Sequence, residues 1–117
     1  MSCPKFIVDS FAVRTAAHLL HLSSTNYAQH VALADFYTSL VGLIDRYAEA
    51  YMAMDGQIKS WPSPSKIEAV GPVSLLENYL ETVQAEQGED ESEALENILA
   101  EIEELTMGSI YKLRFLK

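Results

Sequence analysis

The feature that most constrains the fold is the stretch from Tyr27 to Asp55, which contains no proline and only one glycine, Gly42. It is longer than an average helix. Apolar residues recur along it at helical spacings and cover more than one of its faces. We therefore predict a central helix that is covered by other helices of its own subunit and by a second chain. Gly42 lowers helix stability, which predicts a close helix or subunit contact at that point.

The length of 117 residues predicts a single domain, 1–117, with one core that needs no disulfide. Cys3 is the only cysteine, which excludes a disulfide within the chain and suits a reducing compartment, and we expect a free surface thiol there. The N-terminal residues lack the apolar run of a signal peptide, and no segment is long enough to span a bilayer. We expect a soluble protein of the cytoplasm.

Three further helices are predicted from apolar spacing and from capping residues. The first runs from about Asp9 to Leu22 and forms a tight hairpin with the central helix through the turn at 23–26. The others run from about Pro72 to Gln87 and, after an Asp90/Glu93 capping box, from about Glu91 to Phe115. Five mostly apolar residues of the first helix gather near one face: Phe11, Ala12, Thr15, Leu19 and Leu22.

The connection from Gln57 to Gly71 determines the predicted topology. It is long enough to run back along much of the central helix, so that the next helix starts from the opposite end. Trp61 is expected to pack this connection onto the bundle, and residues 65–70 are expected to form a short helical turn. The predicted fold is all-α, a ferritin-like four-helix bundle with a long crossover between its second and third helices.

The charge of the chain is strongly acidic, with a formal net charge of −9. Between Glu77 and Glu104 there are eleven acidic residues and no lysine or arginine. Such a surface repels phosphate, so direct binding to nucleic acid is not expected. The acidic run is interpreted as a solvated helix face, with attraction of cations as the functional alternative.

Four polar residues are candidate metal ligands: His21, His30, Asp45 and Glu49. Imidazole and carboxylate together suit iron, zinc or manganese. The chain has no Glu-x-x-His motif, which excludes a di-iron centre within one subunit. Because His30 and Asp45 lie about 22 Å apart along a helix, one ion cannot contact both in one chain. A two-fold dimer would bring His21 and His30 of one chain to Asp45 and Glu49 of its mate, and His18 could substitute for His21.

These spacings resemble a known family. The residues that carry the resemblance are His30, Phe36, Asp45, Ala48 and Glu49, which are similar to one helix of the Dps-like miniferritins. That likeness implies a shell of twelve subunits with inter-subunit iron sites and ferroxidase activity, His21 providing a further ligand. Ala34 stands where the family has an acidic ligand. The segment 27–37 and the C-terminal end also resemble short phage-encoded ferritin-like proteins, which implies the host cytoplasm.

Two functions from different classes follow. The first is a homo-oligomeric, Dps-like subunit that binds iron or a similar divalent metal between subunits. The alternative is a metal-free ferritin-like phage or bacterial protein that acts by binding a host protein through its acidic face. A small-ligand site between helices has only the precedent of other bundles.

Overall fold

Four helices make up the computed structural model, which describes residues 3–68, 71–89 and 92–117. They are α1 (Cys3–Leu22), α2 (Tyr27–Asp55), α3 (Pro72–Glu86) and α4 (Glu93–Phe115). No strand occurs among the described residues. The prediction of an all-α, four-helix chain is therefore confirmed. Within the same residues, no helix is long and apolar enough to cross a membrane.

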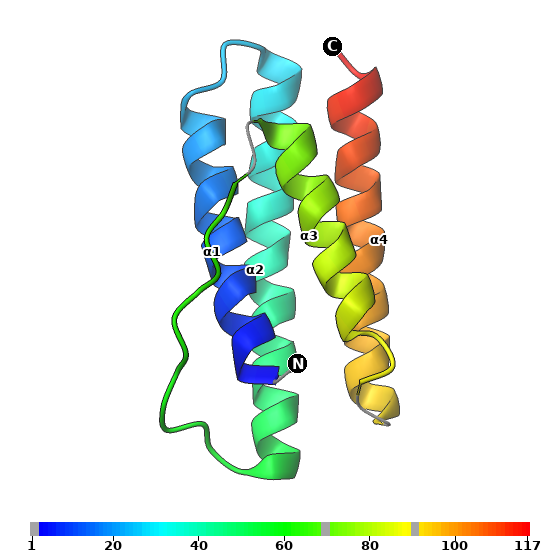
Figure 1. Ribbon diagram of the computed structural model, residues 1–117. Helices are drawn as coiled ribbons and strands as arrows, with labels where there is room; N and C mark the ends of the chain where they lie inside the picture. The colour runs from blue at the N-terminus through cyan, green and yellow to red at the C-terminus, as the bar shows by residue number, and fades with distance from the viewer. Residues whose placement is uncertain (1–2, 69–70, 90–91) are drawn as a thin grey trace.

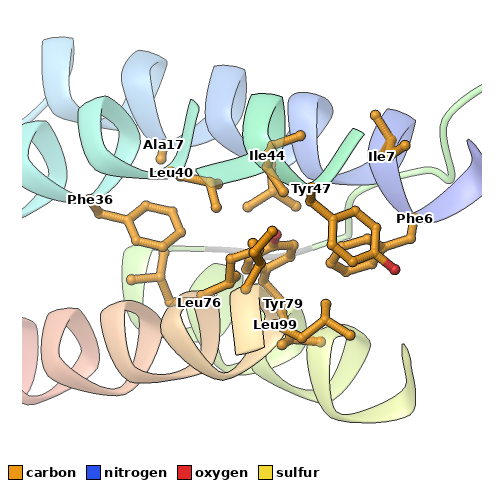
Figure 2. Packing of buried hydrophobic residues seen from close by; sticks show 14 of the residues in the cluster. Phe6, Ile7, Ala17, Phe36, Leu40, Ile44, Tyr47, Leu76, Tyr79 and Leu99 are labelled. Carbon is orange, nitrogen blue, oxygen red and sulfur yellow. The ribbon is translucent and has the colours of Figure 1, made fainter. Parts of the chain in front are cut away.

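Each helix packs against two of the others. Helix α1 contacts α2 and α3, and α4 contacts the same two helices from the opposite corner. Neighbouring helices run antiparallel, as Figure 1 shows. The core lies between all four and is formed mainly by aliphatic and aromatic side chains, among them Phe6, Leu33, Phe36, Leu40, Ile44, Leu76, Leu95, Leu99 and Ile102. Phe6 lies against the rings of Tyr47 and Tyr79 (Figure 2).

The start of α1 and its buried face differ from the sequence prediction. The helix begins at Cys3 instead of Asp9, because Phe6 and Ile7 are completely buried and extend it toward the N-terminus. Proline is compatible with the first turn, so Pro4 does not prevent this extension. Cys3 is half-buried against the core, not a fully exposed thiol.

This longer helix turns its other face to the core. The buried residues of α1 are Phe6, Ile7, Ser10, Val13 and Ala17. The apolar residues that the sequence grouped together therefore point outward: Phe11, Leu19 and Leu22 are 38%, 59% and 66% exposed. Packing of Phe6 and Ile7 overrides the weaker pattern further along the helix.

The segment that follows α2 leaves its C-terminal end and returns along α1 to the start of α3 (Figure 1). Polar contacts fasten it to α1. The Asp9 carboxylate accepts hydrogen bonds from the Ser65 backbone N–H at 2.6 Å and from its hydroxyl at 3.1 Å. The Lys5 ammonium donates to the Ser63 carbonyl oxygen at 2.9 Å.

Two predictions for this segment are wrong. Trp61 is 48% exposed and does not belong to the core. Hydrogen bonds to Asp9 and Lys5 attach the segment to α1 instead. Residues 65–68 form no helical turn, and residues 69–70 lie outside the described residues.

The helix ends follow ordinary capping chemistry. Asn26 caps α2 by accepting the Gln29 backbone N–H at 3.1 Å, and Gly56 ends α2 with a φ of 93°, a conformation that favours glycine. Ser92 caps α4 through the Leu95 backbone N–H. The predicted cap, Asp90, lies outside the described residues.

Candidate functional site

Two of the four predicted ligands meet at the α1/α2 hairpin. His21 is in the last turn of α1 and His30 is in the first turns of α2, and both are half-buried. Their rings stack with centroids 3.7 Å apart and planes inclined by 22°. The structure therefore brings together two imidazoles that are nine residues apart in the sequence.

Reciprocal hydrogen bonds fix the orientation of both rings. The Nδ1 atom of His21 lies 2.7 Å from the His30 carbonyl oxygen, and the Nδ1 atom of His30 lies 3.0 Å from the His21 carbonyl oxygen. A carbonyl oxygen only accepts, so each Nδ1 must carry a proton and donate. In the neutral imidazole this leaves the lone pair on Nε2, which is the atom able to bind a metal.

The geometry of the stack limits what the pair can coordinate. An imidazole binds a metal in its own plane, at about 2 Å from the nitrogen. Lone pairs in two planes inclined by 22° do not converge at that distance. As stacked, the two rings therefore cannot chelate one ion, and each can offer a single bond through its own Nε2.

The aromatic neighbours of this pair form a structural cluster. His18 stacks on Tyr37 at 4.1 Å between ring centroids, and the guanidinium carbon of Arg14 lies 5.6 Å from the centre of the same Tyr37 ring. Tyr37 also meets His21 edge-on. These contacts link α1 to α2 over about two turns, so His18 packs the hairpin in this structure.

The two predicted carboxylate ligands lie elsewhere on α2. Asp45 and Glu49 are both exposed and one helical turn apart, about 22 Å and about 28 Å along the axis from His30. Neither makes a hydrogen bond or ion pair with any residue that the structure describes. In residues 3–68, 71–89 and 92–117 there is no group of three or more His, Cys, Asp or Glu side chains that could hold a metal.

The neighbours of His30 do not complete a metal site within the chain. Ala34 is half-buried and has no ligand atom in its side chain. The Asp35 carboxylate turns toward α4, where it lies 4.0 Å from the Lys112 ammonium. The outward face of α2 is open at Gly42, because a Cβ placed there would meet no atom within 4 Å. No close helix contact exists at Gly42 within the described chain, and a subunit contact there stays a prediction.

One buried acidic residue, Glu86, was not among the predicted site residues. Glu86 is only 3% exposed, and the Tyr47 hydroxyl donates to its Oε2 atom at 3.4 Å. Its Oε1 atom is buried without a hydrogen-bond partner among the described residues. Burial raises the pKa of the Glu86 carboxyl, while the hydrogen bond from Tyr47 acts in the opposite direction. The signal was present, since Glu86 continues the apolar spacing of Tyr79 and Val83 on α3.

Comparison with known proteins identifies a family without a known activity. No curated protein and no solved structure matches the chain. A family model described as "Family of unknown function (DUF5856)" matches residues 21–113, which include both hairpin histidines and most of the bundle. The chain belongs to this family, DUF5856.

Proposed function

We propose that this chain is a subunit of a ferritin-like oligomer that binds iron or a similar divalent cation where two copies meet. The observation that carries the proposal is the pair Asp45 and Glu49, which are exposed one turn apart without a partner in the described chain. Like charges at this spacing repel and destabilise a helix. A bound cation would convert that repulsion into attraction.

The donor types fit such a cation. Two carboxylates with an imidazole suit iron, zinc or manganese. The imidazole would be the Nε2 atom of His30 or His21 from the second copy. Because the stacked rings do not converge on one point, each ion would take one of them, or one ring would turn.

The contact between copies has apolar surface available. Phe11, Leu19 and Leu22 are exposed on the outward face of α1. Leu19 and Leu22 are close to His21 in the chain. Thr38 lies about midway along α2 between His30 and the Asp45/Glu49 pair. A two-fold axis that crosses α2 near Thr38 would therefore place His30 of one copy opposite Asp45 and Glu49 of the other. Thr38 is exposed, so its outer side is free for this contact. We include in this proposal that the four helices follow the ferritin-like order, with a long crossover between α2 and α3.

The test is metal binding combined with oligomeric state. We expect titration calorimetry with Mn²⁺ or Zn²⁺ to give about one ion per subunit in an oligomeric sample. The double variant Asp45→Asn, Glu49→Gln should lose binding by about tenfold or more. Glu77→Gln with Glu81→Gln, which changes the net charge equally on α3, is the control and should bind normally. An oligomer that binds no metal would favour the alternative, a metal-free interaction protein.

A further inference from the structure

The outward ridge of α4 changes character along its length. In the first half its exposed residues are polar or small: Glu93, Ala94, Asn97, Ala100, Glu101 and Glu104. In the second half they include three large apolar residues, Met107, Tyr111 and Phe115, which are 53%, 55% and 67% exposed. Lys112 and Arg114 are exposed beside them. The helix is therefore acidic at one end and aromatic at the other.

This chain does not use the aromatic half of the ridge for its own core. The buried residues of α4, such as Leu95, Leu99 and Ile102, lie on the opposite side of the helix. The rings of Tyr111 and Phe115 contact each other, with centroids 5.5 Å apart, and remain in solvent. Exposed aromatic residues gathered on one helix are characteristic of a protein interface.

The charges of α4 follow the same division. The acids Glu93, Glu101 and Glu104 precede the apolar part, while the bases Lys112 and Arg114 accompany it. An antiparallel second copy of the helix would bring Glu104 of each copy toward the bases of the other, and a two-fold axis makes this contact twice. This charge pattern complements itself, which singles out a second copy of the chain as the partner.

We propose that two copies of this chain pack with their α4 helices antiparallel and crossing at Gly108. Glu104 and Lys112 each lie four residues from Gly108, so they are equally far from such a crossing, on opposite sides. Glu104 of each copy then faces Lys112 of the other. Tyr111 and Phe115 of each copy cover the small and polar residues of the first half, including Ala100.

The contacts already formed within the chain leave Glu104 and Lys112 available for a contact between copies. Glu101 is held by Arg46 through two hydrogen bonds, and Arg114 is paired with Glu77. Glu104 has no hydrogen bond or ion pair with any described residue, and Lys112 only approaches Asp35 at 4.0 Å. Gly108 is exposed, and a Cβ placed there would meet no atom within 4 Å, so the backbone of a second helix has room to approach.

This contact is separate from the one in the proposed function. The metal site requires the side of the bundle that carries the hairpin and Asp45, whereas the α4 contact uses the outward face of another helix. The α4 contact is therefore tested in the Asp45→Asn, Glu49→Gln background with chelator. Absence of the α4 contact would leave the metal-site proposal unaffected, and absence of metal binding would leave the α4 proposal unaffected.

The experiment is a charge reversal followed by sedimentation equilibrium. Glu104→Lys and Lys112→Glu should each weaken self-association by about tenfold or more, because like charges then face each other twice. The double variant with both changes should recover most of the affinity. The matched control is Glu81→Lys, which makes the same change at an exposed position of α3 and should leave association unchanged.

A second variant guards against loss of folding. Replacing Tyr111 and Phe115 by Ser should abolish association without changing the far-UV circular dichroism spectrum, because neither side chain belongs to the core. Three results would overturn the proposal: a monomer at tens of micromolar, a self-association affinity that neither charge reversal changes, or a folded double variant that does not regain the affinity.

Discussion

Polar side chains have partners at the hairpin between α1 and α2 but lack them on the outward surfaces of α2 and α4. At the hairpin, His21 and His30 stack and donate to each other's backbone. On the outward surfaces, Asp45, Glu49 and Glu104 have no partner in the described chain. We therefore expect the histidines to stabilise the fold of this chain and the outward carboxylates to contribute little to it. It is the second set that remains available to a cation or another copy.

The largest expected effect is on the hairpin. His30→Ala removes one half of the stack and leaves the His21 carbonyl oxygen without the hydrogen bond from the His30 Nδ1 atom, so the free energy of unfolding should fall by about 2–3 kcal/mol. Urea denaturation in chelator measures it. Gln29→Ala, in the same turn of α2, is the control and should cost less than about 0.5 kcal/mol. Equal costs for the two variants would mean that the stack does not hold the hairpin.

The second-largest effect is expected at the buried Glu86, where substitution should raise the free energy of unfolding. Glu86→Gln keeps a hydrogen-bonding side chain and removes a buried charge, so the free energy of unfolding should rise by about 1–2 kcal/mol at pH 7. Thermal and urea unfolding of both proteins give this difference.

The pH dependence of that difference has a defined sign. Burial raises the folded-state pKa of Glu86 above the ordinary 4.5. Below pH 4.5 the carboxyl is protonated in both states, so the variant should gain little there. As the pH rises from 4.5 through the raised folded-state pKa, ionisation favours unfolding of the wild type and the gain should grow. A gain that shrinks with rising pH would contradict the burial assignment.

A smaller gain is expected on the open face of α2. Gly42→Ala should stabilise the monomeric fold by about 1 kcal/mol, because alanine is the better helix former and its Cβ meets nothing within 4 Å. Gly56→Ala is the contrasting control, since a φ of 93° strains any residue with a Cβ, and it should destabilise. Loss of stability in Gly42→Ala would indicate a close contact at this face.

The smallest effect on stability belongs to the candidate carboxylates. In chelator, the double variant Asp45→Asn, Glu49→Gln should change the free energy of unfolding by no more than about 0.5 kcal/mol, toward higher stability. With saturating metal, the wild type should gain stability that the variant does not. A large loss in chelator would show that these side chains support the fold.

The central helix was predictable because its signals are local. Asn26 and Gly56 terminate α2 where the sequence predicted, and the caps depend on residues within one turn. The start of α1 was not predictable in this way. It depends on Phe6 and Ile7 packing against distant helices, and that packing also decides which face is buried.

The candidate site was predictable only in part. Helical spacing placed His21 and His30 at one end and Asp45 far away, and the structure agrees on both points. The stacking of the two rings depends on the angle between α1 and α2, which no spacing encodes. The role of Asp9 in holding the return segment was equally hidden, because its partner Ser65 lies 56 residues away.

The most direct test of an oligomer with metal sites between its subunits is light scattering of the purified chain at micromolar concentration, combined with metal analysis of the same sample. We predict a mass of at least two 13.0 kDa chains, with about one divalent ion per subunit after incubation with Mn²⁺ and removal of excess. A 13.0 kDa species that carries no metal under the same conditions would contradict both the assembly and the site.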